Sequence, residues 1–283
     1  MTELQKTEFA MLTEFVRICD TLGLTYYLVC GSALGAAKYG GFIPWDDDID
    51  VALPRKDYEI FLEKAPDMLP AWYFLQNHRT DKQFHQVGSK LRDSRTTYVE
   101  QMTENLDIHH GVYIDVFPLD GQWADEKEQR RYRKMKKQFE GKRRVHLAYN
   151  RFSRSTLFMW RTNAYYLCNR LFGAFSDTSS CIAQYDRLIA SYPLERSERW
   201  CNYANSASET EYAPREQYGD GVMMSFEGLE VRIPEQYDAY LTQKYGDWRA
   251  DLPEDQKKGH HYYVVCDLHT PYNEYMKEGR VCR

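Results

Sequence analysis

Residues 25–53 read TYYLVCGSALGAAKYGGFIPWDDDIDVAL, and this stretch decides the fold that we expect. Its first six residues are mostly β-branched or aromatic and predict a strand that Gly31-Ser32 ends. Residues 33–39 predict a short helix, which the glycine pair at positions 40–41 ends. Residues 42–53 predict a second strand, because apolar and acidic side chains alternate there before Pro54. The stretch therefore predicts a strand, a helix and an acidic strand, with a glycine-serine turn at the first junction.

The acidic strand is the first candidate for a functional site. Side chains alternate across a strand, so Asp46, Asp48 and Asp50 are expected on one face, and Asp47 on the apolar face. Carboxylates on one face repel each other and are stable together only when a cation or protons neutralise them. Oxygen ligands without nearby His or Cys favour Mg²⁺ or Mn²⁺ over zinc, and Mg²⁺ is commonly shared with substrate phosphates. We therefore predict Mg²⁺ (or Mn²⁺) on the three aspartates and give Asp47 a structural or solvent role.

The glycine-serine turn is the second candidate. The start of a helix offers free backbone N–H groups to an anion, and Gly31 permits a close approach. The hydroxyl of Ser32 could bind a phosphate, or it could only cap the helix. Gly31 and Ser32 are therefore candidate substrate-binding residues, with Lys38 of the same short helix as a weaker one.

Two further segments carry candidate charges. Asp115 lies in a predicted strand and is expected either to complete the metal shell or to accept a proton from a substrate hydroxyl. Lys90 and Arg92 are two residues apart, so they share a strand face and could clamp a diphosphate, although a surface pair fits equally well. His260-His261 lacks ligand spacing and is left out of the site. Asp120, which follows Pro118, is interpreted as a turn residue.

Periodicity predicts the elements around this centre. Helices are expected at 4–22 and 55–65, and strands at 71–76, 84–91 and 111–117. Together these patterns predict an α+β fold, in which a mixed sheet is flanked by helices and an additional helical region. The glycine-serine turn, the short helix and the acidic strand resemble the signature of the nucleotidyltransferase superfold, which implies a nucleotidyltransferase-like sheet. We divide the chain into a catalytic core at 1–122, a basic and aromatic-rich helical region at 123–205, and a part at 206–283 that completes the catalytic domain with a hairpin, a helix and a tail.

Composition excludes several classes of protein. The longest run without Asp, Glu, Lys or Arg, Thr21–Ala37, is interrupted by glycines and is too short to span a membrane. Six charged residues among the first 20 argue against a secretory signal, so we expect a cytoplasmic protein. The seven cysteines include no C-x-x-C pair, which favours reduced thiols over disulfides or structural zinc.

The charge is unevenly distributed. Residues 127–154 hold twelve Lys or Arg and two acids, whereas the whole chain has a net charge of −5. Aromatic residues follow at 152–175. A solvated helix face and a peripheral membrane contact through 127–175 both fit this pattern. Nucleic acid is not expected as a partner, because the overall charge is negative and no motif for it is present.

Several segments together resemble one known family. GSALGAAK at 31–38 and GFIPWDDDID at 41–50 resemble the signature of the LicD family, which includes fukutin and fukutin-related protein. The resemblance continues in KLRD at 90–93, GVYIDVFPLD at 111–120, YGDW at 245–248 and the pair at 260–261. The cysteine cluster that carries zinc in fukutin-related protein has no counterpart in this sequence.

The resemblance implies a metal-dependent transferase. Its donor would be a CDP-alcohol such as CDP-choline, its acceptor a hydroxyl of a cell-surface glycan or of a lipid-linked precursor at the inner face of the membrane, and CMP would be released. Asp48, Asp50 and Asp115 would carry catalysis. Two alternatives remain: transfer of a nucleoside monophosphate from an NTP to a small-molecule hydroxyl, with release of pyrophosphate, and an inactive glycan-binding protein of the same fold.

Overall fold

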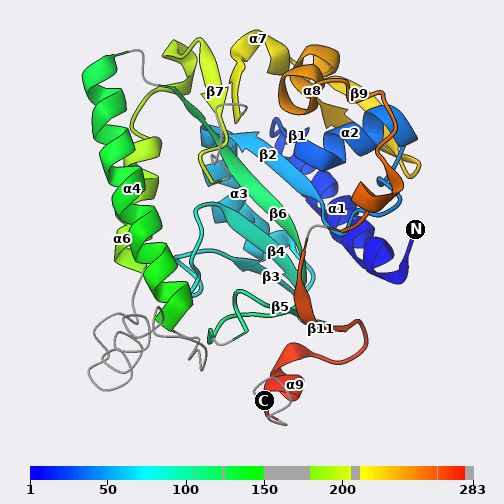
Figure 1. Cartoon of the computed structure of the whole chain (residues 1–283). Coiled ribbons are helices and arrows are strands. Elements are labelled where there is room, and N and C mark those ends of the chain that lie inside the picture. Colours follow the sequence, from blue (N-terminus) through cyan, green and yellow to red (C-terminus); the bar gives the residue numbers. More distant parts are fainter. Residues whose placement is uncertain (105, 123–124, 150–178, 205–210, 260, 278–283) are drawn as a thin grey trace.

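A computed structural model describes residues 1–283 except 105, 123–124, 150–178, 205–210, 260 and 278–283. A seven-stranded mixed sheet forms the centre of the molecule, and helices pack around it (Figure 1). The predicted α+β class is therefore confirmed. No helix in the described part of the chain is both long and apolar enough to cross a membrane.

The sheet is built around one long buried strand, β6 (Val112–Gly121). β2 (Asp50–Pro54) runs parallel to β6 on one side, and β1 (Tyr27–Leu28) pairs antiparallel with β2. On the other side, β4 (Ser89–Asp93) and then β3 (Tyr73–Gln76) follow in antiparallel order. At its far end β6 also pairs with β7 (Arg199–Cys201), which in turn pairs with β8 (Tyr212–Pro214).

Helices α1 (Glu3–Leu22) and α3 (Arg55–Met68) pack against this sheet and against each other. Thr2 and Gln5 form a capping box at the start of α1, and Gly23 ends the helix in a left-handed conformation with φ 65°. The apolar stripe of α1 is buried, and the ring of Phe15 lies 5.0 Å from that of Phe61 in α3. Both helices therefore form as the periodicity predicts, because their apolar faces have a common core to enter.

A second, smaller core lies between α4 (Glu126–Tyr149) and α6 (Ser179–Ile189). The ring of Tyr185 in α6 stacks on that of Phe139 in α4 at 4.6 Å. In Figure 1 the two helices stand side by side at the left flank of the sheet. The basic helix that we predicted is thus present in α4, whereas the aromatic segment at 152–175 lies outside the described residues.

The C-terminal part contributes to two separate two-stranded sheets. After α7 (Arg215–Tyr218), β9 (Val222–Phe226) and β10 (Leu229–Ile233) form the predicted hairpin, and α8 (Tyr237–Tyr245) is the predicted helix. β11 (Tyr263–Asp267) pairs with β5 (Thr97–Glu100), a pairing that the sequence analysis did not predict, and α9 (Tyr272–Lys277) follows. The domain boundaries at 122 and 205 stay predictions.

Several local predictions were wrong. Of the strand expected at 84–91, only the last three residues belong to β4. The strand expected from residue 42 begins only at Asp50, and the residues before it form a loop that Gln5 holds through its side-chain amide, which donates to the carbonyl of Asp46 at 3.0 Å. Helix α2 (Cys30–Tyr39) begins three residues earlier than expected, so Gly31 and Ser32 lie in its first turn. Asp120 is a buried residue of β6 and not a turn residue, because Arg55 neutralises its carboxylate at 2.6 Å.

Candidate active site

Three strands bring charged side chains into one row. In the parallel pairing of β2 with β6, Asp50 lies opposite Asp115, and in the antiparallel pairing of β4 with β6, Lys90 lies opposite the same Asp115. Residues opposite each other on neighbouring strands point to the same face of the sheet. The ammonium group of Lys90 lies 2.9 Å from a carboxylate oxygen of Asp115. The structure thus brings together two predicted carboxylates and one predicted cation.

These side chains face a cavity of about 290 Å³, which we call the polar cavity. Asp48 lines it together with the row of Asp50, Asp115 and Lys90. Its remaining charged wall residues and its aromatic wall residues are Glu100, Lys136, Glu140, Arg143, His261, Phe117, Phe139, Tyr185 and Tyr203.

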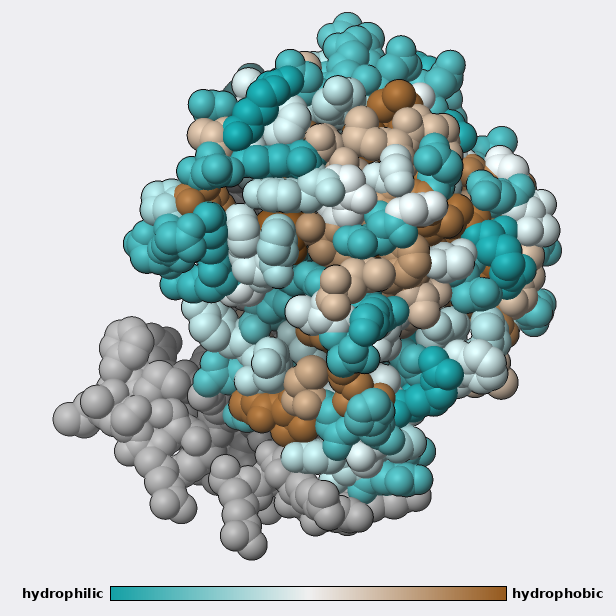
Figure 2. Space-filling view, turned by 90° about the vertical axis from the view of Figure 1, so that its right-hand side faces the viewer, coloured by the Kyte–Doolittle hydropathy of each residue, from teal (hydrophilic) through white to brown (hydrophobic). Residues whose placement is uncertain are grey.

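A second cavity of about 460 Å³ adjoins the polar cavity at Asp48 and Asp50, and we call it the aromatic cavity. Its other wall residues include Gly31, Lys38, Tyr39, Trp45, Asp46, Tyr245 and Trp248. Hydrophobic side chains gather between hydrophilic ones on the face of the molecule that carries α1 and α2 (Figure 2). Since Asp48 and Asp50 line both cavities, the two carboxylates form a partition between them.

The crowded carboxylates hold their protons tightly. Burial, together with the charges of Asp48 and Asp47, raises the pKa of Asp46 to about 8. Burial also raises the pKa of Asp50 well above its usual value, and the charges of Asp48 and Asp115 raise it further. A divalent cation would remove this penalty. Carboxylate oxygens are the type of ligand that Mg²⁺ and Mn²⁺ prefer.

Gly31 and Ser32, in the first turn of α2, contact the acidic segment. The hydroxyl oxygen of Ser32 accepts a hydrogen bond from the backbone N–H of Asp50 at 2.8 Å and is buried. A Cβ atom on Gly31 would lie only 2.8 Å from a carboxylate oxygen of Asp46. The turn therefore positions the first and last of the three aspartates, and Gly31 also lines the aromatic cavity.

The other predicted cations have protein partners. Arg92 is 1% exposed and donates to the side-chain oxygen of Gln76 and to the carbonyl of Gly111, both at 2.6 Å. It is not among the described residues that line the polar cavity. Lys38 lines the aromatic cavity instead, where it donates to the carbonyl of Ala250 at 2.8 Å and lies 3.3 Å from a carboxylate oxygen of Asp251. Of the predicted cations, the structure therefore brings only Lys90 to the polar cavity.

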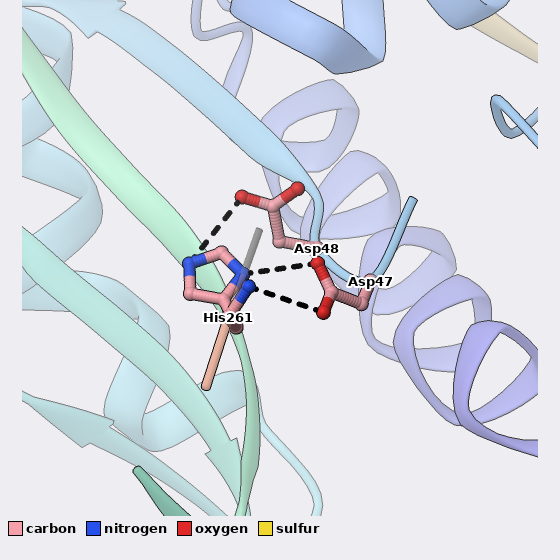
Figure 3. Close-up of side chains that lie close together, drawn as sticks. All are labelled: Asp47, Asp48 and His261. Atoms are coloured by element: carbon pink, nitrogen blue, oxygen red, sulfur yellow. Dashed lines mark hydrogen bonds and ion pairs between the residues drawn. The ribbon is translucent and has the colours of Figure 1, made fainter. Parts of the chain in front are cut away.

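His261 is a site residue that the sequence analysis missed. Its backbone N–H donates to one carboxylate oxygen of Asp47, and its Nδ1 lies 3.2 Å from the other (Figure 3). Its Nε2 lies 3.8 Å from Asp48. Burial alone would lower the pKa of His261, but the hydrogen bond with Asp47 and the charge of Asp48 raise it to about 9. The ligand atoms of the three residues lie within 4.8 Å of one another, so they too could hold a metal ion.

Helix α4 supplies the other missed residues. Lys136, Phe139, Glu140 and Arg143 line the polar cavity opposite the acidic row. The sequence feature that could have indicated these residues is the basic stretch, in which residues three or four positions apart share a helix face. The sequence does not show how α4 packs against α6, so it does not distinguish these residues from their solvent-exposed neighbours.

Residues 23–158 match the family model described as LicD/FKTN/FKRP, nucleotidyltransferase domain. The lipopolysaccharide cholinephosphotransferase LicD of Haemophilus influenzae is 26% identical over 264 residues, which cover 89% of this chain and 92% of that protein. The ribitol 5-phosphate transferases FKRP of Mus musculus and Homo sapiens are each 43% identical over 42 residues, which cover 15% of this chain and 8% of either relative.

Proposed function

This chain belongs to the LicD/FKTN/FKRP family through its nucleotidyltransferase domain at residues 23–158, and on that premise we propose that it is a metal-dependent transferase of a phosphorylated alcohol. The donor is a CDP-alcohol, with CDP-choline as the first choice. The acceptor is a hydroxyl of a cell-surface glycan or of its lipid-linked precursor. The name of the Haemophilus relative, a lipopolysaccharide cholinephosphotransferase, supports both the phosphocholine group and the glycan.

The position of the carboxylates between the two cavities carries this proposal. Asp48 and Asp50 line both cavities, and Asp115 stands beside Asp50 in the polar cavity. A transfer reaction needs two substrates whose reacting atoms meet, and two cavities that adjoin at Asp48 and Asp50 offer a place for that meeting. Negative charge must also be stabilised on the attacking, transferring and leaving oxygens, which carboxylates without a cation cannot do.

We propose that Asp48, Asp50 and Asp115 hold Mg²⁺ or Mn²⁺, with Asp46 at the edge of the site. When bound, the ion neutralises charge on the phosphoryl oxygens. In the reaction an acceptor hydroxyl attacks the phosphorus that bears the alcohol, a new P–O bond forms, and the bond to the CMP oxygen breaks. Asp115 lines the polar cavity and either holds the ion or takes the hydroxyl proton.

A panel of CDP-alcohols tests this function. CDP-choline, CDP-ethanolamine, CDP-glycerol and CDP-ribitol are each incubated with the protein and a glycan acceptor, and CMP is measured with Mg²⁺ or with EDTA. We expect CMP formation with at least one donor, dependent on the metal. Release of pyrophosphate from an NTP, with no CMP from any CDP-alcohol, would support the alternative transfer of a nucleoside monophosphate.

A further inference from the structure

One face of α4 forms the wall of the polar cavity that lies opposite the carboxylates. Lys136, Phe139, Glu140 and Arg143 line the cavity at spacings of three, one and three residues. Residues three, four and seven positions apart share one helix face, so the helix presents two cations, an acid and an aromatic ring together. The neighbouring Lys137 is exposed and does not belong to this wall.

Arg143 carries an unsatisfied donor. Its Nε atom is buried and has no hydrogen-bond partner in the described part of the chain. A buried N–H group of a guanidinium is costly when it lacks an acceptor, so such groups in native proteins call for an explanation. Because Arg143 lines a cavity, a ligand in that cavity is the simplest acceptor.

Cations lie close to protein acids throughout the site. Lys90 lies 2.9 Å from Asp115, and in the aromatic cavity Lys244 lies 2.5 Å from Glu211. Lys136 lies 4.0 Å from its helix neighbour Glu140. Lys136 and Arg143 are the two cations that α4 contributes to the wall of the polar cavity, and Arg143 has a buried donor that a ligand could satisfy.

We propose that Lys136 and Arg143 bind a phosphate group of a substrate in the polar cavity. The arginine fork suits phosphate oxygens, and lysine adds a point charge. This inference deepens the proposed function, which supplies two sources of phosphate: the diphosphate of the donor, or a phosphate that the acceptor glycan carries near its reacting hydroxyl. Both sources present a phosphate group to Lys136 and Arg143, and the experiment below distinguishes the donor from the acceptor.

The experiment measures binding and needs no turnover. Lys136→Gln, Arg143→Gln and the double variant are compared with Lys137→Gln, which removes the same charge from the exposed side of α4. Isothermal titration with Mg²⁺ present uses three probes: CDP-choline, inorganic pyrophosphate and glycerol 3-phosphate. Thermal unfolding of each variant confirms that α4 remains docked.

Each cation should contribute about 10-fold to the affinity for one class of probe. A weaker Kd for CDP-choline and pyrophosphate in the double variant identifies the donor diphosphate, and a weaker Kd for glycerol 3-phosphate identifies an acceptor phosphate. Lys137→Gln should change each Kd less than about twofold. Unchanged affinities in the double variant, or a wild-type protein that binds none of the probes, would overturn the proposal. Pyrophosphate and glycerol 3-phosphate still bind if the proposed transfer reaction fails, so the two failures are distinguishable.

Discussion

Asp48 belongs to the acidic cluster and lines both cavities, as Asp50 does. Keeping its buried carboxylate ionised costs free energy. Burial and the charges of Asp115 and Asp47 raise its pKa. We predict that Asp48→Asn lowers the rate of CMP formation by at least about 100-fold, because the proposed metal site loses one of its ligands. The thermal midpoint of the metal-free variant should equal or exceed that of the wild type, since the substitution relieves repulsion. A variant with full activity would remove Asp48 from the mechanism.

Asp46 makes the stability of the metal-free protein depend on pH. Its pKa is about 8 in the folded protein and 3.8 as the unperturbed value. Between these values the unfolded chain releases a proton that the folded chain keeps, so the free energy of unfolding falls as pH rises from about 4 to about 8. We predict a declining thermal midpoint in EDTA over this window.

The Asp46→Asn variant provides the control for that pH profile. It should show a flatter decline in EDTA, and Mg²⁺ should raise the wild-type midpoint most near pH 8. A metal-free midpoint that rises steadily from pH 4 to pH 8 in the wild type, with no effect of the substitution, would contradict the expected sign.

At the residue scale, the sequence predicted several side chains that line the polar cavity, but it did not predict which groups the charged side chains contact. The alternation in the acidic segment and the spacing of Lys90 placed Asp50, Asp115 and Lys90 on faces that do meet in the polar cavity. Arg92 has the same parity as Lys90, yet it is buried against Gln76 and Gly111. Strand parity gives the face of a side chain but not what covers that face. His261 lies more than 200 positions from Asp47, so no local pattern could reveal their contact.

Among the elements, α2 depends most on small residues. A Cβ atom at Gly35 would lie 2.4 Å from the carbonyl oxygen of Gly41, a backbone atom that cannot move aside alone. We predict that Gly35→Ala lowers the free energy of unfolding by about 1–3 kcal/mol through overpacking. The matched control is Gly141→Ala in α4, where a Cβ atom would meet no atom of the described residues within 4 Å, and this variant should gain about 0.5–1 kcal/mol from helix propensity. Urea unfolding that gives both variants the same sign would contradict the prediction.

The element predictions failed where contacts with distant parts of the chain decide the local structure. Residues 43–48 have the alternation of a strand, but α1 takes their backbone hydrogen bonds through Gln5, which donates to the carbonyls of Ile43 and Asp46. β5 and β11 were missed because each finds its partner about 165 residues away along the chain. Helices with a clear apolar stripe, such as α1 and α3, were predicted from local periodicity, since burying the stripe needs only a common core.

At the scale of the whole molecule, Arg55 joins the sheet to the helical region. It lies 2.6 Å from Asp120 in β6 and 3.0 Å from Asp186 in α6. We predict that Asp120→Asn destabilises the protein by about 3 kcal/mol, because breaking a buried pair leaves Arg55 without its main counter-charge. Chemical denaturation measures this loss. The exposed pair of Arg130 and Glu126 gives the control, as Glu126→Gln should change stability by less than about 1 kcal/mol.

The partition formed by Asp48 and Asp50 also has a consequence for inhibitor design. Occupants of the two cavities approach each other only at these carboxylates, so a single compound with one arm in each cavity would pass its tether beside them. Such a tether turns the second binding event into an intramolecular one, and affinity grows without any new contact in either cavity. A cationic tether would gain most, because its positive charge would offset the repulsion between the crowded carboxylates.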